Sequence, residues 1–186
     1  QLPTGGSKTV IFSEIARKYI ATTDKKVLIL THRIELSKQT SQMLLEFGVS
    51  NKIIDSNVKM VSNDPNYYCF VAMVETLNNR LKEGKVSLSD IGMVIVDEAH
   101  YNSFRKLFKY FEACFILGVT ATPLSSNILL PMHQIYQDLI VGENISSLIK
   151  NGFLSEASTF GFNVSLTSLK VGMNGDYTVK SSEELY

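Results

Sequence analysis

The chain carries no excess of charge of either sign. Its 186 residues include 18 lysines and arginines and 18 aspartates and glutamates, so the formal net charge is zero. The net charge of the chain therefore gives no sign of a nucleic-acid partner. This absence is only weak evidence against such a partner, because a local stripe of a few cations is enough to contact phosphates.

Cysteine is scarce, and long apolar runs are missing. The two cysteines, Cys69 and Cys114, lie in apolar stretches and are expected to be buried thiols. No spacing of cysteine and histidine resembles a zinc site. The sequence contains no signal-peptide pattern and no apolar run long enough to span a bilayer. These absences favour a reducing cytoplasm as the location.

A starting methionine is also missing. Gln1 stands directly before a glycine-rich segment typical of a phosphate-binding loop. Such a loop normally follows a strand, and that strand is barely represented here. We therefore expect the chain to be a fragment of a longer protein.

Apolar residues are abundant, at 45% of the chain, and can form a sizeable core. Near-continuous apolar runs predict buried strands at 25–30, 68–73, 91–98 and 114–123. Amphipathic stretches predict helices at 8–21, 33–48, 74–84 and 102–113. This alternation predicts an α/β domain with right-handed crossovers and a parallel sheet that is covered on both faces.

The pattern changes after Pro123. Residues 124–157 are irregular and then helical in character, and residues 158–166 predict a last strand. The polar stretch 168–186 is typical of a hairpin or a linker. We divide the chain into a lobe over 1–157 and a region over 158–186 that holds the last strand and the start of a linker.

The first segment that carries chemistry is Pro3-Thr4-Gly5-Gly6-Ser7-Lys8-Thr9. A phosphate-binding loop needs glycines for close backbone approach, a lysine that neutralises the β- and γ-phosphates and a hydroxyl that ligates Mg²⁺. Gly5, Gly6, Lys8 and Thr9 supply these parts. Taken alone, the segment is also compatible with an ordinary glycine turn before a helix.

The second segment, at 94–100, is an apolar strand that ends in Asp97-Glu98-Ala99-His100. Ligands bind at the carboxyl edge of such sheets, where Asp97 can hold Mg²⁺ and Glu98 can act as general base on water. An acid pair at a helix start is the alternative for this segment alone. A phosphate loop and an acid pair in this order make coincidence a poor explanation.

A third strand end, at 118–123, carries Thr120 and Thr122. Two hydroxyls there can link the acid pair to a moving part. Alone, the segment is equally compatible with a threonine-rich strand end.

Together these segments resemble the first RecA-like lobe of a superfamily 2 helicase of the DEAH type, over most of residues 1–123. PTGGSKT resembles motif I, ILTHRIEL motif Ia, VAMVETL the TVQTL-like segment, VDEAH motif II and GVTATP motif III. The set is most similar to the restriction-subunit and repair-helicase branch. It is less similar to DEAD-box RNA helicases, whose motif II ends in aspartate where this chain has His100. The resemblance implies a RecA-like P-loop NTPase domain, mainly parallel, with helices on both faces.

The resemblance implies a role for each matching residue. Lys8 would contact the β- and γ-phosphates, and Glu98 would orient and deprotonate water. Thr9 and Asp97 would hold Mg²⁺. The other implied roles are phosphate binding by Thr4, Gly5, Gly6 and Ser7, coupling of nucleotide state to nucleic-acid grip by His100, Thr120 and Thr122, and contact with the nucleic-acid backbone by His32, Arg33, Thr76 and Asn78.

Plainer interpretations stay open for two of the nucleic-acid residues. Arg33 is also compatible with a solvated cation at a helix start, and Asn78 with an exposed helix residue. Contacts to the backbone carry no base specificity, which suits a translocase that moves over any sequence.

Ser7 departs from the pattern, which has glycine at this position. A non-glycine residue with positive φ costs about 1 kcal/mol or more, and its side chain can crowd the phosphate. We expect a loop that forms but binds ATP more weakly or rests collapsed. The alternative is that the hydroxyl adds a hydrogen bond and the loop tolerates it.

The sequence therefore predicts the first motor lobe of an ATP- and Mg²⁺-dependent nucleic-acid helicase or translocase, with DNA favoured over RNA. A second RecA-like lobe would complete the site with an arginine, so the 186 residues alone are expected neither to unwind duplex nor to hydrolyse ATP appreciably. A nuclease or methyltransferase subunit is a possible partner. The alternative is a catalytically impaired module for nucleic-acid binding or assembly. A small-molecule P-loop kinase is disfavoured, because it does not explain the DEAH, TATP and HRIEL segments together.

Overall fold

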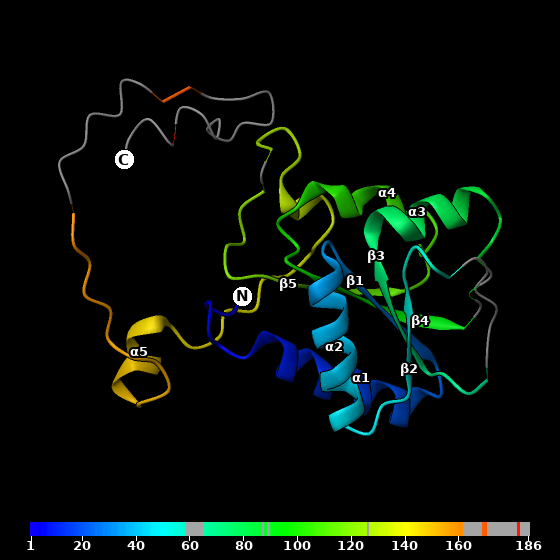
Figure 1. Cartoon of the computed structure of the whole chain (residues 1–186), viewed down its shortest axis with the longest axis horizontal. Coiled ribbons are helices and arrows are strands. Elements are labelled where there is room, and N and C mark those ends of the chain that lie inside the picture. Colours follow the sequence, from blue (N-terminus) through cyan, green and yellow to red (C-terminus); the bar gives the residue numbers. More distant parts are fainter. Residues whose placement is uncertain are drawn as a thin grey trace. The chain divides into compact units, whose positions relative to one another are not determined.

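The structure is a computed structural model that describes residues 1–58, 65–86, 88, 90–125, 127–161, 169, 170 and 182. The chain divides into two units, Gln1–Leu154 and Ser155–Tyr186. The first unit holds all the strands and helices discussed below (Figure 1).

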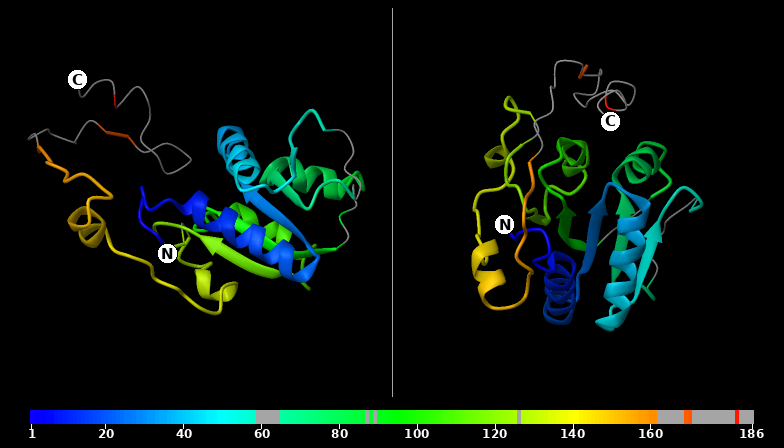
Figure 2. Two further views of the ribbon diagram at one scale, coloured as in Figure 1. Left: turned by 90° about the horizontal axis from the view of Figure 1, so that it is seen from below. Right: turned by 60° about the vertical axis from the view of Figure 1, so that its left-hand side comes forward.

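The described residues of the first unit form one parallel sheet of five strands in the order β2-β3-β1-β4-β5 (Figure 2). Parallel pairing of near-continuous apolar strands confirms the predicted α/β class. The sequence missed β2, which is short and starts with two polar residues. The strands are β1 Lys26–Thr31, β2 Asn51–Ile54, β3 Cys69–Met73, β4 Ile91–Asp97 and β5 Phe115–Val119.

Helices cover both faces of the sheet, as predicted. Alternate side chains of each buried strand serve opposite faces, so Leu28 and Leu30 of β1 join one core cluster while Val27 and Ile29 join the other. Helices α1 (Lys8–Thr23) and α2 (Ile34–Glu46) pack on the second cluster.

The other face is covered by α3 (Val74–Lys82), the 3₁₀ turn η1 (Asn102–Phe104) and α4 (Arg105–Phe108). The helix predicted over 102–113 is therefore wrong in its length. Phe104, Leu107 and Phe111 still bury their side chains against the sheet, which explains the aromatic pattern without a long helix.

The carboxyl ends of the parallel strands meet at one edge of the sheet. There β1 ends at Thr31, β4 at Asp97 and β5 at Val119. The amino-terminal segment reaches the same edge, because the backbone N–H of Leu2 donates to the carbonyl of Thr120 at 3.1 Å. Segments that lie far apart in the sequence are thereby brought together around one site.

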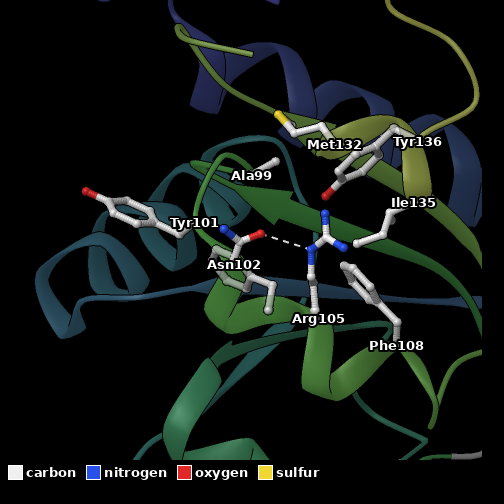
Figure 3. A pocket seen from close by; sticks show the side chains of 9 residues that line it. Ala99, Tyr101, Asn102, Arg105, Phe108, Met132, Ile135 and Tyr136 are labelled. Atoms are coloured by element: carbon white, nitrogen blue, oxygen red, sulfur yellow. Dashed lines mark hydrogen bonds between the residues drawn. The ribbon is translucent and has the colours of Figure 1, made fainter. Parts of the chain in front are cut away.

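The segment after Pro123 is irregular until the short helix α5 (Ile145–Lys150), with one 3₁₀ turn, η2 (Met132–Gln134). The side chain of Arg105 lies against this irregular segment and is hydrogen-bonded to it around η2 (Figure 3). The guanidinium donates to the carbonyls of Leu130 and Pro131, both at 2.6 Å, and to the side chains of Asn102 and Gln134. The small cavity beside Arg105 measures about 10 Å³, room for no more than a water.

Few residues of the second unit are described. Residues 158–161, the described part of the predicted last strand, form no strand. The rest of that prediction, and nearly all of the predicted hairpin or linker at 168–186, fall outside the described residues. None of the helices in the described ranges is long and apolar enough to cross a bilayer.

Both cysteines are described, and both are free thiols. Cys69 is fully buried in β3, and burial raises the pKa of its thiol. Cys114 is only half-buried, contrary to the expectation of burial, and its thiol donates to the carbonyl of Ile91 at 3.1 Å.

Candidate functional site

The phosphate loop is a tight turn that leads directly into α1. The backbone N–H of Gly6 donates to the carbonyl of Pro3 at 2.9 Å, and Gly5 has a φ of 80°. Ser7 precedes the first residue of α1, and its carbonyl accepts the first helical hydrogen bond, from Ile11. Lys8 therefore lies in the first helical turn, at the positive end of the helix dipole.

Ser7 has the left-handed backbone conformation that the sequence argument identified as costly, with φ 53° and ψ 39°. Within the described part of the chain its hydroxyl makes no capping hydrogen bond to α1. The expected positive φ is therefore present at Ser7, while the alternative that its hydroxyl adds a hydrogen bond and the loop tolerates it stays a prediction. The effect of Ser7 on the approach of a phosphate also stays a prediction.

A contact that the sequence did not suggest lies against the same loop. A Cβ added to Gly5 would lie 2.7 Å from Cδ2 of Leu154, at the end of the first unit. Nearby, the N–H of Gly142 donates to the carbonyl of Gln1 at 2.9 Å. The end of the first unit thus lies beside the phosphate loop, although about 150 residues separate them in the sequence.

The acid pair stands where β4 ends. Asp97 is 6% exposed, and its pKa is raised, first by burial and then by the negative charge of Glu98. Its Oδ1 accepts the N–H of Glu98 at 3.0 Å. Glu98 has a φ of 51°, and the N–H of Tyr101 donates to its carbonyl at 3.1 Å. Glu98 therefore stands in a strained turn directly after the strand.

That carboxylate meets the phosphate loop. Glu98 Oε1 lies 3.7 Å from Nζ of Lys8, and the two side chains are 27% and 14% exposed. Its other oxygen, Oε2, lies 3.5 Å from Nδ1 of His100. The two residues predicted as catalytic are thus in contact.

The predicted coupling residues form a hydrogen-bonded group beside Glu98. Nδ1 of His100 lies 2.9 Å from Oγ1 of Thr120. The same hydroxyl accepts the N–H of Thr122 at 3.1 Å and lies 3.2 Å from its carbonyl. The ends of β4 and β5 are therefore linked through side chains as well as through the sheet.

The predicted metal residues suit Mg²⁺ by their chemistry. In nucleotide sites Mg²⁺ takes one or two carboxylates together with phosphate oxygens and waters. Asp97 offers a carboxylate that keeps acceptor capacity beyond its one described hydrogen bond, and Thr9 offers a hydroxyl from the first turn of α1. No group of three or more histidine, cysteine or acidic side chains is gathered for a metal ion among the described residues.

An open cleft of about 400 Å³ lies next to this group. Its lining includes two of the four predicted nucleic-acid residues, His32 and Arg33, together with Glu98 and His100 of the DEAH segment. Arg33 is exposed, whereas burial, followed by the charge of Arg33, lowers the pKa of half-buried His32. The cleft is lined by Thr4, His32, Arg33, Leu36, Glu98, His100, Tyr101, Ala121 and Thr122.

The other two predicted nucleic-acid residues lie on α3 and do not line this cleft. Thr76 is half-buried. Asn78 is only 4% exposed, so the interpretation of an exposed helix residue is wrong. Its Oδ1 has no hydrogen-bond partner among the described residues, and the burial leaves little of the side chain for a contact with nucleic acid.

Sequence reasoning also missed Tyr101 and Leu36 as lining residues. Tyr101 directly follows the DEAH segment, so its position was a usable signal. Leu36 lies in the ILTHRIEL segment, for which the resemblance to motif Ia gave Leu36 no role of its own.

Comparison with known proteins agrees with this geometry. A family model described as "Type III restriction enzyme, res subunit" matches residues 1–125, which contain every predicted site residue. No curated protein matches the sequence significantly.

Solved helicase structures share the fold. The chain is similar to UvsW of bacteriophage T4 (23% identity, TM-score 0.54, covering 66% of this chain and 26% of that one) and to the Hef helicase domain of Pyrococcus furiosus (26%, 0.55, 67% and 29%). It is also similar to LlaGI, a type ISP restriction-modification enzyme solved with a DNA substrate mimic (18%, 0.59, 82% and 18%). The chain therefore spans only part of the length of each of these proteins.

The family match covers most of the chain, and the parallel sheet carries its motifs on one edge. The chain therefore belongs to the type III restriction enzyme Res-subunit family, a branch of the superfamily 2 helicases, and its sheet is a RecA-like helicase lobe.

Proposed function

We propose that this chain is the first motor lobe of an ATP-driven helicase or translocase that acts on nucleic acid, with DNA favoured over RNA. One observation carries the proposal above the others. Lys8 and Glu98, which come from segments far apart in the sequence, meet within 3.7 Å beside the buried Asp97. A cation, a general-base candidate and a metal ligand at one sheet edge are what phosphoryl transfer to water requires.

Each of these residues has a defined task in the proposed site. Bound Mg²⁺ would neutralise charge that develops on the phosphates. Asp97 and Thr9 would hold that ion, and Lys8 would contact the β- and γ-phosphates. Glu98 would then exchange its contact with Lys8 for a water molecule, orient it and accept its proton. Thr4, Gly5, Gly6 and Ser7 would surround the phosphates with backbone N–H groups.

The cleft supports the nucleic-acid part of the proposal. Arg33 is exposed at its rim, where a guanidinium suits phosphates of any sequence. The membership in a restriction-subunit family favours DNA. A second RecA-like lobe and a nuclease or methyltransferase subunit are the expected partners, by analogy with restriction-modification enzymes such as LlaGI.

Calorimetric titration of Mg·ATP into this chain tests the nucleotide site. Ser7→Gly is the matched variant without the backbone strain, and Lys8→Ala is the negative control. We expect binding that is tighter for Ser7→Gly and weakest for Lys8→Ala. Binding that is unchanged in Lys8→Ala would contradict the proposed site.

Turnover forms a separate test. We expect no appreciable hydrolysis by this chain alone, because an arginine from the second lobe would have to stabilise the transition state, an effect of about 10³–10⁵ in other nucleotide hydrolases. Rapid nucleic-acid-stimulated hydrolysis by these 186 residues would contradict the need for an arginine from a second lobe.

The geometry of Ser7 favours a second candidate function, a lobe that has lost catalysis and serves binding or assembly. Its left-handed conformation has no described compensating cap. Binding of Mg·ATP by Ser7→Gly together with no binding by the native chain would make this candidate the better account.

A further inference from the structure

Tyr101 has no part in the proposed catalytic chemistry, yet its ring contacts two histidines of the site. Its centroid is 4.2 Å from that of His100 and 4.7 Å from that of His32, with interplanar angles of 38° and 46°. These separations are in the range of attractive contacts between aromatic rings. The backbone of Tyr101 is fixed as well, by its hydrogen bond to the carbonyl of Glu98.

The two histidines differ in how else they are held. His100 has Thr120 at hydrogen-bond distance and Glu98 close by. Nδ1 of His32 is buried and, in the part of the chain that is described, has no hydrogen-bond partner. The orientation of the His32 ring therefore depends on packing, and Tyr101 is the aromatic neighbour that supplies it.

Packing of the core does not account for this placement. Tyr101 is 39% exposed, whereas the core on its side of the sheet is filled by buried residues such as Phe104 and Leu107. In Figure 3 the ring of Tyr101 points away from Arg105 and Tyr136, toward the outside of the small cavity.

The contacts form a continuous path across the site. Lys8 meets Glu98, Glu98 meets His100, and His100 meets Tyr101. Tyr101 then meets His32, which precedes the exposed Arg33. Every step is a direct contact of side chains or of chain neighbours, so a change at the phosphate loop has a physical route to the rim of the cleft.

We propose that Tyr101 is a positioning residue that transmits the arrangement of His100, on the nucleotide side, to His32 and the Arg33 loop. The functional meaning of this coupling rests on the proposed motor function. The coupling itself is a property of the ligand-free chain, so it can be tested even if the chain binds no nucleotide.

Histidine NMR provides the test, because the chain has three histidines and the third, His133, lies in η2 and serves as internal reference. The perturbation is Thr120→Val, which removes the hydroxyl beside His100 and keeps the side-chain shape. It is introduced into the native chain, into Tyr101→Phe and into Tyr101→Leu. The ring C–H resonances of all three histidines are followed through a pH titration.

In the native and Tyr101→Phe backgrounds we expect Thr120→Val to move the resonances of both His100 and His32, with His133 unchanged. In Tyr101→Leu we expect His100 to move as before and His32 to move clearly less, because the ring contact is missing and only the charge of His100 still acts on His32. The charged or titratable neighbours of His32, namely Arg33, Glu98 and His100, are the same in all backgrounds.

Two results would overturn the proposal: an unchanged His32 in the native background, or an equal movement of His32 with and without the ring. A general loss of structure would also shift the ring resonances of His133, so it can be distinguished from a change at His32 alone. If Tyr101→Leu fails to fold, Tyr101→Met takes its place as the ring-free background. Calorimetry with Mg·ATP is independent of these spectra, so a failure of the proposed function is distinguished from a failure of the coupling.

Discussion

Ser7 and Glu98 have nearly the same positive φ angle at two turns that meet across the candidate site. Their φ angles are 53° and 51°, in the left-handed region that non-glycine residues rarely occupy. The side chain of Glu98 contacts Lys8 and His100. The hydroxyl of Ser7, within the described chain, contributes no cap to α1. The positive φ therefore accompanies specific side-chain contacts at Glu98, whereas no such contact of the Ser7 hydroxyl is described.

The two strained residues differ in what a glycine substitution would remove. A glycine in place of Glu98 would form the turn more easily but would remove the carboxylate that the site needs. A glycine in place of Ser7 would form the turn more easily and, on the described contacts, would remove nothing. Strain that persists together with specific contacts indicates function, whereas strain alone does not.

The largest expected effect tests the functional turn. Glu98→Gln keeps the shape of the side chain and removes its ability to accept a proton, so we expect ATP hydrolysis by this lobe, assayed together with the proposed second lobe, to fall by about 10²–10⁴-fold. Steady-state phosphate release measures the rate. Mg·ATP binding by calorimetry is the control and is expected to persist. A loss of less than about tenfold in rate, well below the contribution of a general base, would contradict the role of Glu98.

The neighbour of Glu98 provides the next effect, on stability. Burial raises the pKa of the Asp97 carboxyl above its ordinary value of 3.8. The folded state therefore holds this proton more tightly than the unfolded state, and stability falls as the pH rises from about 3.8 through the folded-state pKa. At pH 7 the ionised, buried carboxylate carries the full penalty, about 1.4 kcal/mol for each pKa unit of the shift.

Asp97→Asn removes this penalty, and its amide oxygen can still accept the N–H of Glu98. We expect the variant to melt at a higher temperature than the native chain near neutral pH, by roughly 2–4 °C for each kcal/mol gained. The difference should shrink as the pH falls through the raised folded-state pKa of Asp97 and be smallest below the ordinary aspartate value of 3.8. Thermal unfolding followed by circular dichroism at several pH values measures both. A destabilised variant at neutral pH would show that Asp97 is held by favourable contacts instead.

A smaller effect compares the two turns directly. Ser7→Gly and Glu98→Gly each relieve a left-handed non-glycine residue, worth about 1 kcal/mol. We expect Ser7→Gly to raise the free energy of unfolding by about that amount, and Glu98→Gly to gain less, because it also loses the contacts with Lys8 and His100. Denaturant titrations measure both variants. Equal gains would show that the Glu98 contacts contribute no stability.

Regular patterns in the sequence predicted the core of the fold, and irregular ones did not. Strands β1 and β4 are nearly continuous apolar runs. Such runs are typical of parallel strands that are buried on both faces, so the sequence predicted both the parallel sheet and the helices that cover it. The strand β2 did not, because it holds only four residues and its first two, Asn51 and Lys52, are polar. The length of the helix after DEAH was also wrong, since aromatic residues can reach the core from turns.

The candidate site was predictable as a set of residue types but not as a set of contacts. The family pattern selected Lys8 and Glu98, and the strained backbone at Ser7 followed from the absence of a glycine. The burial of Asn78 and the approach of Leu154 to Gly5 depend on tertiary packing between distant segments, which no local pattern encodes.

The smallest expected effect isolates the side chain of Ser7 from its backbone. Ser7→Ala keeps a Cβ in the left-handed conformation and removes only the hydroxyl. Because that hydroxyl makes no cap to α1 among the described contacts, we expect the free energy of unfolding to change by less than about 0.5 kcal/mol, as at ordinary surface positions. A loss near 1 kcal/mol, the usual effect of removing a cap, would mean that the hydroxyl stabilises the loop in solution. The two turns would then differ in how much their side chains contribute, and the contrast between strain with contacts and strain without them would no longer hold.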